Sequence, residues 1–456
     1  MIPKIKKFIL FASLALVFFA PKISFAEASL IRDAETEKFL HNLADPIFRA
    51  ANLNPENIKI YIINDDSINA FVSGGQNVFI NTGLIRKYKK PDALIGVIAH
   101  ETGHIAAGHL ARASEEMQKT QNSLLLTYLL GIGAAIGGSP EAGQAIILGG
   151  SNSVEKLYMK YNRGQEEAAD LHALEYLDKI SYPADGLVNL LEFFQREMIG
   201  YQGQIDEYAM SHPVSKKRIN AIKAFSLNKN YSDKKINQPL QETMDRVLAK
   251  LEAFMENPDE ILKKYQNQNS ELANYSKSIA YFRKGNSSES LNLLNEIINK
   301  NSKDGFLFEL KGQILFESGQ ITESIIAYNQ ALKLLGPTDA AQTKIAFASA
   351  ILSLSKNDED LIKIAIKNLS DAKKYEGDNT LLFKQLASAY SKINDEGRSF
   401  LALAEFNFLR GDEEKTTKYA KKAKEKLPKT ATEELLRADD LLDLTKKKKL
   451  KNSTPS

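Results

Sequence analysis

Residues 91–112 read PDALIGVIAHETGHIAAGHLAR, and the interpretation of the chain starts from this stretch. Pro91 and Asp92 suit the first turn of a helix, because proline lacks the N–H that is unused there and a carboxylate favours the positive end of the helix dipole. Apolar residues flank the polar centre of the stretch at Leu94, Ile95, Val97, Ile98 and Ile105. The pattern predicts a buried helix over residues 91–112.

The two histidines at the centre of this helix, His100 and His104, are four residues apart and therefore lie on one helix face. Two imidazoles in that arrangement can bind one metal ion, and Glu101 lies near enough to take a proton from a metal-bound water. This is the HExxH motif of zinc hydrolases. Buried histidines without a partner would be costly, which favours a metal site over two structural histidines. We therefore expect one zinc ion per chain.

Composition limits the remaining ligands of such a site. The 456 residues include no cysteine and six histidines, which excludes disulfides, iron–sulfur clusters and cysteine-based zinc sites. The 60 basic and 57 acidic residues give a net charge of +3, which is no reason to expect a nucleic-acid partner. Histidines and carboxylates must therefore hold the metal ion.

A catalytic zinc site needs a third protein ligand beside a water molecule. His109 comes one residue too early for the HExxHxxGxxH pattern, and on a continued helix it would point about 140° away from His104. We therefore reject it as a ligand. Glu166 and Asp170 are four residues apart in RGQEEAAD (163–170) and share a helix face. Of the available side chains, Glu166 is the better candidate for the third ligand. Asp170 would then accept a hydrogen bond from the ring N–H of a ligating histidine. The alternative is that both acids lie on a solvated helix face without a metal.

Sequence periodicity around this site predicts a mixed N-terminal domain. An amphipathic helix is expected over residues 30–50. Strands are expected at 58–63, 69–72 and 77–80, the last two joined by a glycine turn. Residues 155–225 are typical of further helices. We expect an α+β, zincin-like metallopeptidase domain with a small β-sheet.

The C-terminal half has almost no strand pattern and repeats with a period of 34 residues. Tyr281, Gly285, Ser290, Leu294 and Ile297 recur as Leu315, Gly319, Ser324, Tyr328 and Ala331. This spacing is typical of tetratricopeptide repeats, which stack into a solenoid with a concave binding surface; a generic helical bundle is the alternative. The predicted fold class is thus mainly α, with an all-α tetratricopeptide-repeat solenoid after the first domain.

The first 26 residues predict an export signal. Three lysines precede an apolar run from Phe8 to Ala20, and small residues at Ser24 and Ala26 suit a signal peptidase. The run is too short for a comfortable membrane span, although an uncleaved anchor is the alternative. An exported chain without cysteine suits a bacterial periplasm.

Residues 124–150 form a second apolar stretch, rich in glycine and alanine. Small residues four apart occur where membrane helices pack, but about fifteen apolar residues before Pro140 are too few to span a bilayer. We therefore expect a buried helical hairpin or a flap over a cleft, and no stable transmembrane span in the mature chain.

HETGH at 100–104 together with RGQEEAAD at 163–170 resembles the HExxH…ExxxD pattern of BepA/HtpX-like zinc metallopeptidases. Shorter matching pieces are Asn69-Ala-Phe71, Gly83-Leu-Ile85, Tyr182-Pro183 and His212-Pro213 with Arg218. The resemblance covers about residues 30–225. The signal peptide and the helical C-terminal half fit the periplasmic branch of this family, which carries tetratricopeptide repeats.

The resemblance also implies roles for single residues. The zinc ligands would be His100, His104 and Glu166, the catalytic base Glu101, and the residue that supports a ligand Asp170. His212 would stabilise the oxyanion or occupy the fourth metal position as a self-inhibiting ligand. A histidine at a helix start without a metal role is the alternative. The 124–150 segment would cover the site.

By the same resemblance, the expected function is that of a periplasmic zinc endopeptidase in outer-membrane protein quality control. Its partners would be unfolded or misassembled proteins and the outer-membrane protein assembly machinery. One alternative is a chaperone or scaffold with a latent protease site, and another is a peptidase anchored through residues 124–150. The expected boundaries are 1–26 for the signal peptide, 27–226 for the metallopeptidase domain, 227–268 for a linker and connecting helix, 269–430 for the repeats, and 431–456 for a helical end and a disordered basic tail.

Overall fold

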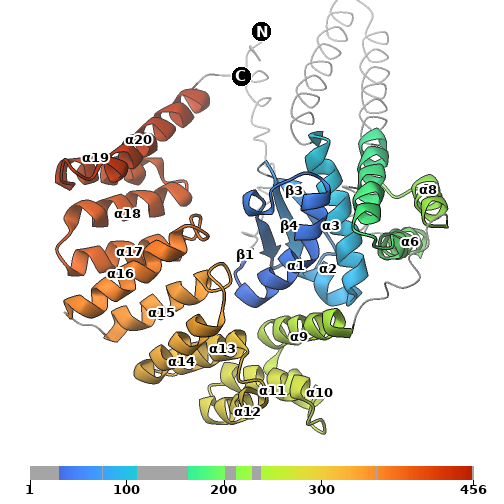
Figure 1. Cartoon of the computed structure of the whole chain (residues 1–456), viewed down its shortest axis with the longest axis horizontal. Coiled ribbons are helices and arrows are strands. Elements are labelled where there is room, and N and C mark those ends of the chain that lie inside the picture. The colour runs from blue at the N-terminus through green and yellow to red at the C-terminus, as the bar shows by residue number, and fades with distance from the viewer. Residues whose placement is uncertain are drawn as a thin grey trace, which may run out of the picture.

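The computed structural model describes residues 30–73, 75–109, 163–200, 212–227, 238–354 and 358–453, without the side chains of 197–200 and 447–453. The expected signal peptide and the 124–150 segment lie outside these residues. A domain with a small sheet and several helices stands beside a curved array of helices that leads to the C-terminus (Figure 1). Among the helices of the described ranges, none has both the length and the apolar character that crossing a bilayer requires.

The sheet of the N-terminal domain has four short strands in the order β1-β2-β4-β3. Their bounds are Leu30–Ile31 for β1, Ile60–Ile63 for β2, Ala70–Ser73 for β3 and Asn77–Asn81 for β4. β2 runs parallel to β4, and β3 runs antiparallel to β4 through a turn where Gly75 has a φ of +98°. The three predicted strands and the glycine turn are confirmed. β1 was not predicted, because two residues are too few to show a period.

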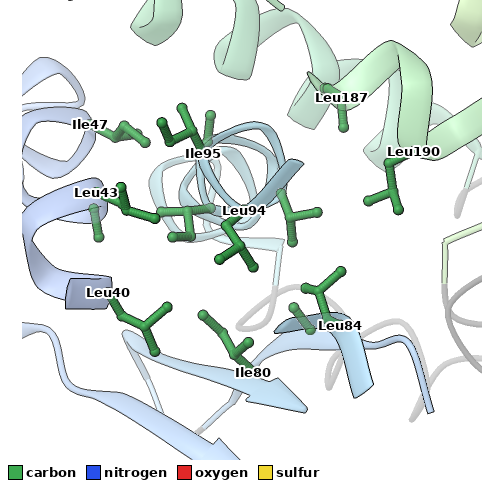
Figure 2. Close-up of a cluster of buried hydrophobic side chains, with 14 of the residues drawn as sticks. Leu40, Leu43, Ile47, Ile80, Leu84, Leu94, Ile95, Leu187 and Leu190 are labelled. Carbon is green, nitrogen blue, oxygen red and sulfur yellow. The ribbon is translucent and has the colours of Figure 1, made fainter. Parts of the chain in front are cut away.

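One face of this sheet packs on helices and forms the core. The buried strand residues alternate along the chain, as in Ile60, Ile62, Val78 and Ile80. They pack on α1 (Ala34–Ala50) and α3 (Pro91–Ala106), and α6 (Asp185–Gly200) packs on α3 and adds to the same buried cluster. Figure 2 shows leucines and isoleucines from these elements meeting around α3. Each fully buried side chain of this kind contributes about 1.5–3 kcal/mol, so the core fixes α3 firmly against the sheet.

Two glycines let neighbouring helices approach α3 closely. A Cβ atom on Gly96 would lie 2.8 Å from the Cβ of Leu187 on α6. A Cβ atom on Gly103 would lie 2.6 Å from the carbonyl oxygen of Ala169, which belongs to the helix over residues 163–179. Any larger residue at Gly103 would push that helix away. The close crossing brings the acidic residues of helix 163–179 beside the histidines of α3.

Shorter helices complete the N-terminal domain. α2 covers Thr82–Tyr88 and α8 covers Lys216–Leu227. The predicted helix over 91–112 is shorter than we expected, because α3 ends at Ala106 and Gly108 adopts a φ of +64°, which breaks the helical path. This early end changes where His109 lies.

The C-terminal region is entirely helical in the described residues, which confirms the mainly α class and the all-α region after the first domain. Its helices are α9 (Gln238–Met255), α10 (Pro258–Lys264), α11 (Glu271–Arg283), α12 (Ser287–Lys300), α13 (Gly305–Glu317), α14 (Ile321–Leu334), α15 (Ala341–Leu354), α16 (Glu359–Lys373), α17 (Thr380–Lys392), α18 (Glu396–Leu409), α19 (Glu413–Lys426) and α20 (Thr432–Ser453). Successive helices pack side by side along the array (Figure 1).

The expectation of a disordered basic tail was wrong for most of its length. α20 continues through the lysine run as far as Ser453. Lysine and leucine favour helices, and the run contains no glycine and no proline before Pro455. A basic run is therefore not by itself a sign of disorder.

α9 joins the two parts of the molecule. Met244, Val247 and Leu251 on this helix belong to the core of the N-terminal domain. Ala249 and Ala253, on another face of the same helix, pack in the first cluster of the helical array. The helix that we expected as a connection thus contributes residues to both hydrophobic cores.

Buried charges lie at this junction. The Nζ atom of Lys250 on α9, whose residue is 5% exposed, forms ion pairs with Asp33 and, at 3.2 Å, with Oε2 of Glu35 at the start of α1. Tyr275 on α11 donates a hydrogen bond of 3.2 Å to the same Glu35 oxygen. Burial lowers the pKa of Lys250, but the charges of Asp33 and Glu35 outweigh it and raise that pKa well above its usual value. The lysine therefore stays charged and binds α1 to the array.

A second contact between the two parts lies further along the array. Between α16 and α17, Glu376 pairs with Arg32 at 2.8 Å, and Asp378 pairs with Lys59 at 2.8 Å. Tyr61 on β2 donates its hydroxyl hydrogen to Asp378. The array therefore contacts the N-terminal domain at several separate places, which include the pair of Lys38 on α1 with Asp339 at 3.3 Å.

Candidate metal centre

Four side chains from three segments converge inside the N-terminal domain. His100 and His104 come from α3, Glu166 from helix 163–179, and His212 from the segment just before α8. One possible ligand atom of each lies within 4.8 Å of the others. His104 is partly buried and the other three are buried, so the group lies inside the domain.

The distances between these atoms suit one metal ion. The Nε2 atoms of His100 and His104 are 3.1 Å apart, and each lies 3.3 Å from an oxygen of Glu166. Nδ1 of His212 lies 3.2 Å from Oε1 of Glu166 and 3.4 Å from Nε2 of His100. Atoms about 3.3 Å apart at the corners of a tetrahedron are about 2.0 Å from its centre, which is the usual zinc–ligand distance.

The charge of the buried groups also suits a divalent cation. Glu101, Glu166 and Asp170 are buried carboxylates, and Arg218 is the buried guanidinium that faces them. With neutral imidazoles these four groups carry a net charge of −2. An uncompensated buried charge of that size is costly, and a zinc ion would neutralise it. Both the donor atoms and the charge therefore fit zinc.

Asp170 and Arg218 contact the candidate ligands on the side that faces away from the expected metal position. Oδ1 of Asp170 lies 3.0 Å from Nδ1 of His100, the ring nitrogen that faces away from the other candidate ligands. Arg218 donates hydrogen bonds of 2.6 Å and 2.9 Å to the two oxygens of Asp170 and pairs with Glu166 at 2.8 Å. In the sequence, Arg218 was noted only as part of the resemblance to BepA/HtpX-like metallopeptidases. No local pattern connects it with Asp170, 48 residues earlier.

The pKa values of these groups follow from the same contacts. Burial raises the pKa of Glu166, but hydrogen bonds from His100, His104 and His212 lower it well below its usual range. Burial also raises the pKa of Asp170, but Arg218 and His100 lower it. Both carboxylates therefore stay ionised. Burial lowers the pKa of His100, yet hydrogen bonds to Asp170 and Glu166 would raise it to about 10 whenever no cation is bound.

His212 contacts both the candidate ligands and Glu101. Its Nδ1 atom faces Glu166, as described, and its Nε2 atom lies 3.4 Å from Oε1 of Glu101. The backbone next to it is fixed, because Arg218 donates a 2.9 Å hydrogen bond to the carbonyl oxygen of Pro213. The His212 ring thus lies between the group of ligand atoms and the glutamate of the HExxH motif.

His109 lies closer to the site than the sequence indicated. The 140° argument assumed a continued helix, whereas the turn at Gly108 returns the chain toward α3. As a result, Nδ1 of His109 lies 3.0 Å from Nδ1 of His104. His109 therefore contacts the ring nitrogen of His104 that faces away from Glu166, and it is not among the grouped ligand atoms.

Three further polar residues of the domain lie away from the site. Glu167 points to the surface and pairs with Lys217 at 2.7 Å. His41 contacts Asp45 at 3.1 Å on α1, and the His172 ring stacks on the Tyr176 ring.

Comparison with known proteins agrees with this geometry. Residues 32–226 match the model of peptidase family M48. This part of the chain is a peptidase family M48 domain. The family is zinc-dependent, in agreement with the His and Glu group inside the domain. The M48 domain is therefore a zinc metallopeptidase domain.

Relatives extend the comparison. The chain is 25% identical over 356 residues to the beta-barrel assembly-enhancing protease of Yersinia pestis, covering 75% of this chain and 67% of the relative. It is 27% identical over 194 residues to the protein of the same name from Escherichia coli K12, covering 42% and 39%. The mitochondrial metalloendopeptidase OMA1 of Schizosaccharomyces pombe is 26% identical over 187 residues, covering 41% and 52%. The chain thus spans well under half the length of the Escherichia coli relative, whereas the Yersinia match reaches beyond the M48 domain.

Proposed function

We propose that this chain is a periplasmic zinc endopeptidase that cleaves unfolded or misassembled polypeptides during outer-membrane protein assembly. The convergence of His100, His104 and Glu166 beside Glu101 carries the proposal. The names of the bacterial relatives support the substrate class and the link with barrel assembly. The export signal that residues 1–26 predict supports the periplasmic location.

In this proposal, His100, His104 and Glu166 hold the zinc ion, and Asp170 orients His100 through its Nδ1 atom. Bound zinc supplies a water molecule of lowered pKa and polarises the scissile carbonyl. Glu101 takes the proton of the attacking water and transfers it to the leaving amine. Arg218 keeps Glu166 and Asp170 ionised and in place.

The metal requirement can be measured directly. The purified chain should contain one zinc ion and should cleave unfolded casein. A chelator should abolish both the zinc content and the cleavage, and added zinc should restore them. His104→Ala should lose stoichiometric zinc, while His172→Ala, an exposed histidine outside the group, should keep it. Cleavage that survives complete zinc removal would contradict the proposed function.

His212 holds the resting site in a latent state in this proposal. Its Nδ1 atom lies among the ligand atoms, where a fourth ligand would take the place of the catalytic water. We expect His212→Ala to keep its zinc and to cleave casein severalfold faster than the wild type. Zinc analysis and a casein assay provide both values. A loss of activity would instead place His212 in oxyanion stabilisation.

The position of His212 also favours a second candidate function, that of a chaperone or scaffold that binds proteins through its helical array. Such a protein would retain unfolded polypeptides without cleaving them. It would remain inactive in the His212→Ala variant, even with zinc bound. The same casein assay therefore separates the two functions.

We also propose the tetratricopeptide-repeat assignment for residues 269–430, with the metallopeptidase domain at 27–226 and the linker and connecting helix at 227–268. The turns after α11 and α13 support it. Gly285 and Gly319, 34 residues apart, have φ values of +78° and +79°. In both turns the residue after the glycine donates to the carbonyl oxygen five residues earlier. Asn394 and Gly411 adopt the same left-handed backbone later in the array.

A further inference from the structure

A row of three aromatic rings crosses the sheet of the M48 domain. Tyr61 on β2 lies directly opposite Phe79 on β4, and Phe79 lies directly opposite Phe71 on β3. The ring centroids are 5.1 Å apart in both pairs, with interplanar angles of 21° and 9°. We call these three residues the aromatic row. Their register and stacking make the row a rigid apolar strip.

The aromatic row lies on the face of the sheet opposite the core. Its members alternate with Ile60, Ile62, Val78 and Ile80, which are buried in the core. Each ring of the row, in contrast, is partly exposed. The outward face of such a sheet usually carries polar side chains. An apolar strip in this position indicates a surface that meets an apolar partner.

The two ends of the aromatic row lie at different functional parts of the molecule. At one end, the Tyr61 hydroxyl and Lys59 bind Asp378 of the helical array. At the other end, Phe71 lies on β3, the last strand of the sheet as the described residues form it. β3 packs against α3, which carries His100 and His104. The row therefore leads from the contact with the array to the strand that packs on the helix of His100 and His104.

An edge strand can pair with an extended polypeptide through main-chain hydrogen bonds, whatever the sequence of that polypeptide. The side chains of the added strand alternate between the two faces of the sheet. A residue directly opposite Phe71 would bring its Cβ atom within about 4.5–5.5 Å of the Phe71 Cβ atom and would extend the row by one position. An aromatic side chain there should improve binding by about 3- to 10-fold.

Where an extended polypeptide substrate pairs along β3, as an edge strand allows, we propose that Phe71, stacked on Phe79 and Tyr61, selects an aromatic side chain on the substrate residue opposite it. This inference rests on the proposed peptidase function and specifies its substrate preference. The preferred substrate is an unfolded segment in which aromatic and polar residues alternate. Lipid-facing strands of β-barrels have this pattern, with aromatic residues near the membrane interfaces.

Binding can be tested separately from cleavage. The probe is a set of fluorescently labelled peptides with a polar, alanine-containing sequence, in which one phenylalanine is moved through successive positions. Their dissociation constants are measured by anisotropy on the full zinc-loaded chain carrying Glu101→Gln, which prevents turnover. We expect phenylalanine at one position to lower the dissociation constant about 3- to 10-fold relative to alanine.

Adding Phe71→Ala should remove this preference, and Phe71→Tyr, which keeps the ring, should preserve it. Leu381→Ala changes an apolar residue on α17 that is 45% exposed and should leave the preference intact. Should Phe71→Ala not fold, Phe71→Leu removes the aromatic ring at nearly constant volume. Equal preference in the wild-type and Phe71→Ala or Phe71→Leu backgrounds would overturn the inference, as would the absence of any positional preference. If peptides bind with the preference but the chain with Glu101 restored cleaves none of them, the proposed peptidase function fails and the inference stands.

Discussion

Replacing Glu101 with glutamine should lower the rate of casein cleavage by about 10²–10⁴-fold while one zinc ion per chain remains bound. Glu101 is 1% exposed and lies beside the grouped ligand atoms without belonging to the group. Glutamine has nearly the same shape but cannot accept the proton of the attacking water. Activity should therefore fall without loss of the metal. Metal analysis and fragment release from casein measure the two quantities on the same sample.

Glu167→Gln is the matched control for this variant. Glu167 is also a glutamate next to a candidate site residue, but it pairs with Lys217 at the surface. We expect wild-type activity and zinc content from it. If Glu101→Gln cleaved casein at the rate of Glu167→Gln, Glu101 would not be the base.

The second large effect concerns stability. Lys250→Ala should lower the free energy of unfolding by about 3–5 kcal/mol, because removing one partner of a buried ion pair leaves the other charge uncompensated. Asp33 would lose the buried ammonium group that faces it across the junction, whereas Glu35 would keep its ion pair with Arg246. Urea denaturation followed by circular dichroism measures the loss. Lys250→Met, which keeps a long apolar stem, should recover only the part of the loss that comes from packing.

Lys284→Ala tests whether burial of the ion pair causes the large loss of stability expected for Lys250→Ala. Lys284 also pairs with an aspartate, Asp259, but at the surface, so its loss should cost less than about 1 kcal/mol. Burial raises the pKa of Asp33, but Lys250 outweighs it and lowers that pKa below its ordinary value of 3.8. The contribution of the Asp33 pair is therefore complete above pH 3.8 and falls as the pH drops through the lowered pKa of Asp33. Equal losses in the two alanine variants at pH 7 would contradict the role of burial.

Local spacing explains what the sequence could predict of the site. His100, Glu101 and His104 follow from one helical turn, and Glu166 and Asp170 from another, because residues four apart share a helix face. Arg218 and His109 follow no such rule. Arg218 meets Asp170 only because α8 packs near helix 163–179, and His109 reaches His104 only because Gly108 leaves the helical path.

The fold shows the same division between local and distant contacts. Short β-branched stretches and a glycine turn predicted β2, β3 and β4, and the lack of a strand pattern predicted the all-helical region. Neither pattern contains information on pairs such as Lys250 with Glu35, which are 215 residues apart. The contacts between the array and the M48 domain are therefore visible only in three dimensions.

The shared helix α9 has a practical consequence for work on fragments. The M48 match ends at residue 226, so a truncated chain that stops there would seem a natural minimal enzyme. Such a fragment would lack Met244, Val247 and Leu251, which fill its core, and Lys250, which neutralises Glu35. Exposed apolar surface and an orphaned buried acid favour aggregation. Inactivity of a short fragment would then reflect poor solubility rather than a catalytic need for the helical array. A fragment that ends after α9 would keep the core residues that this helix supplies.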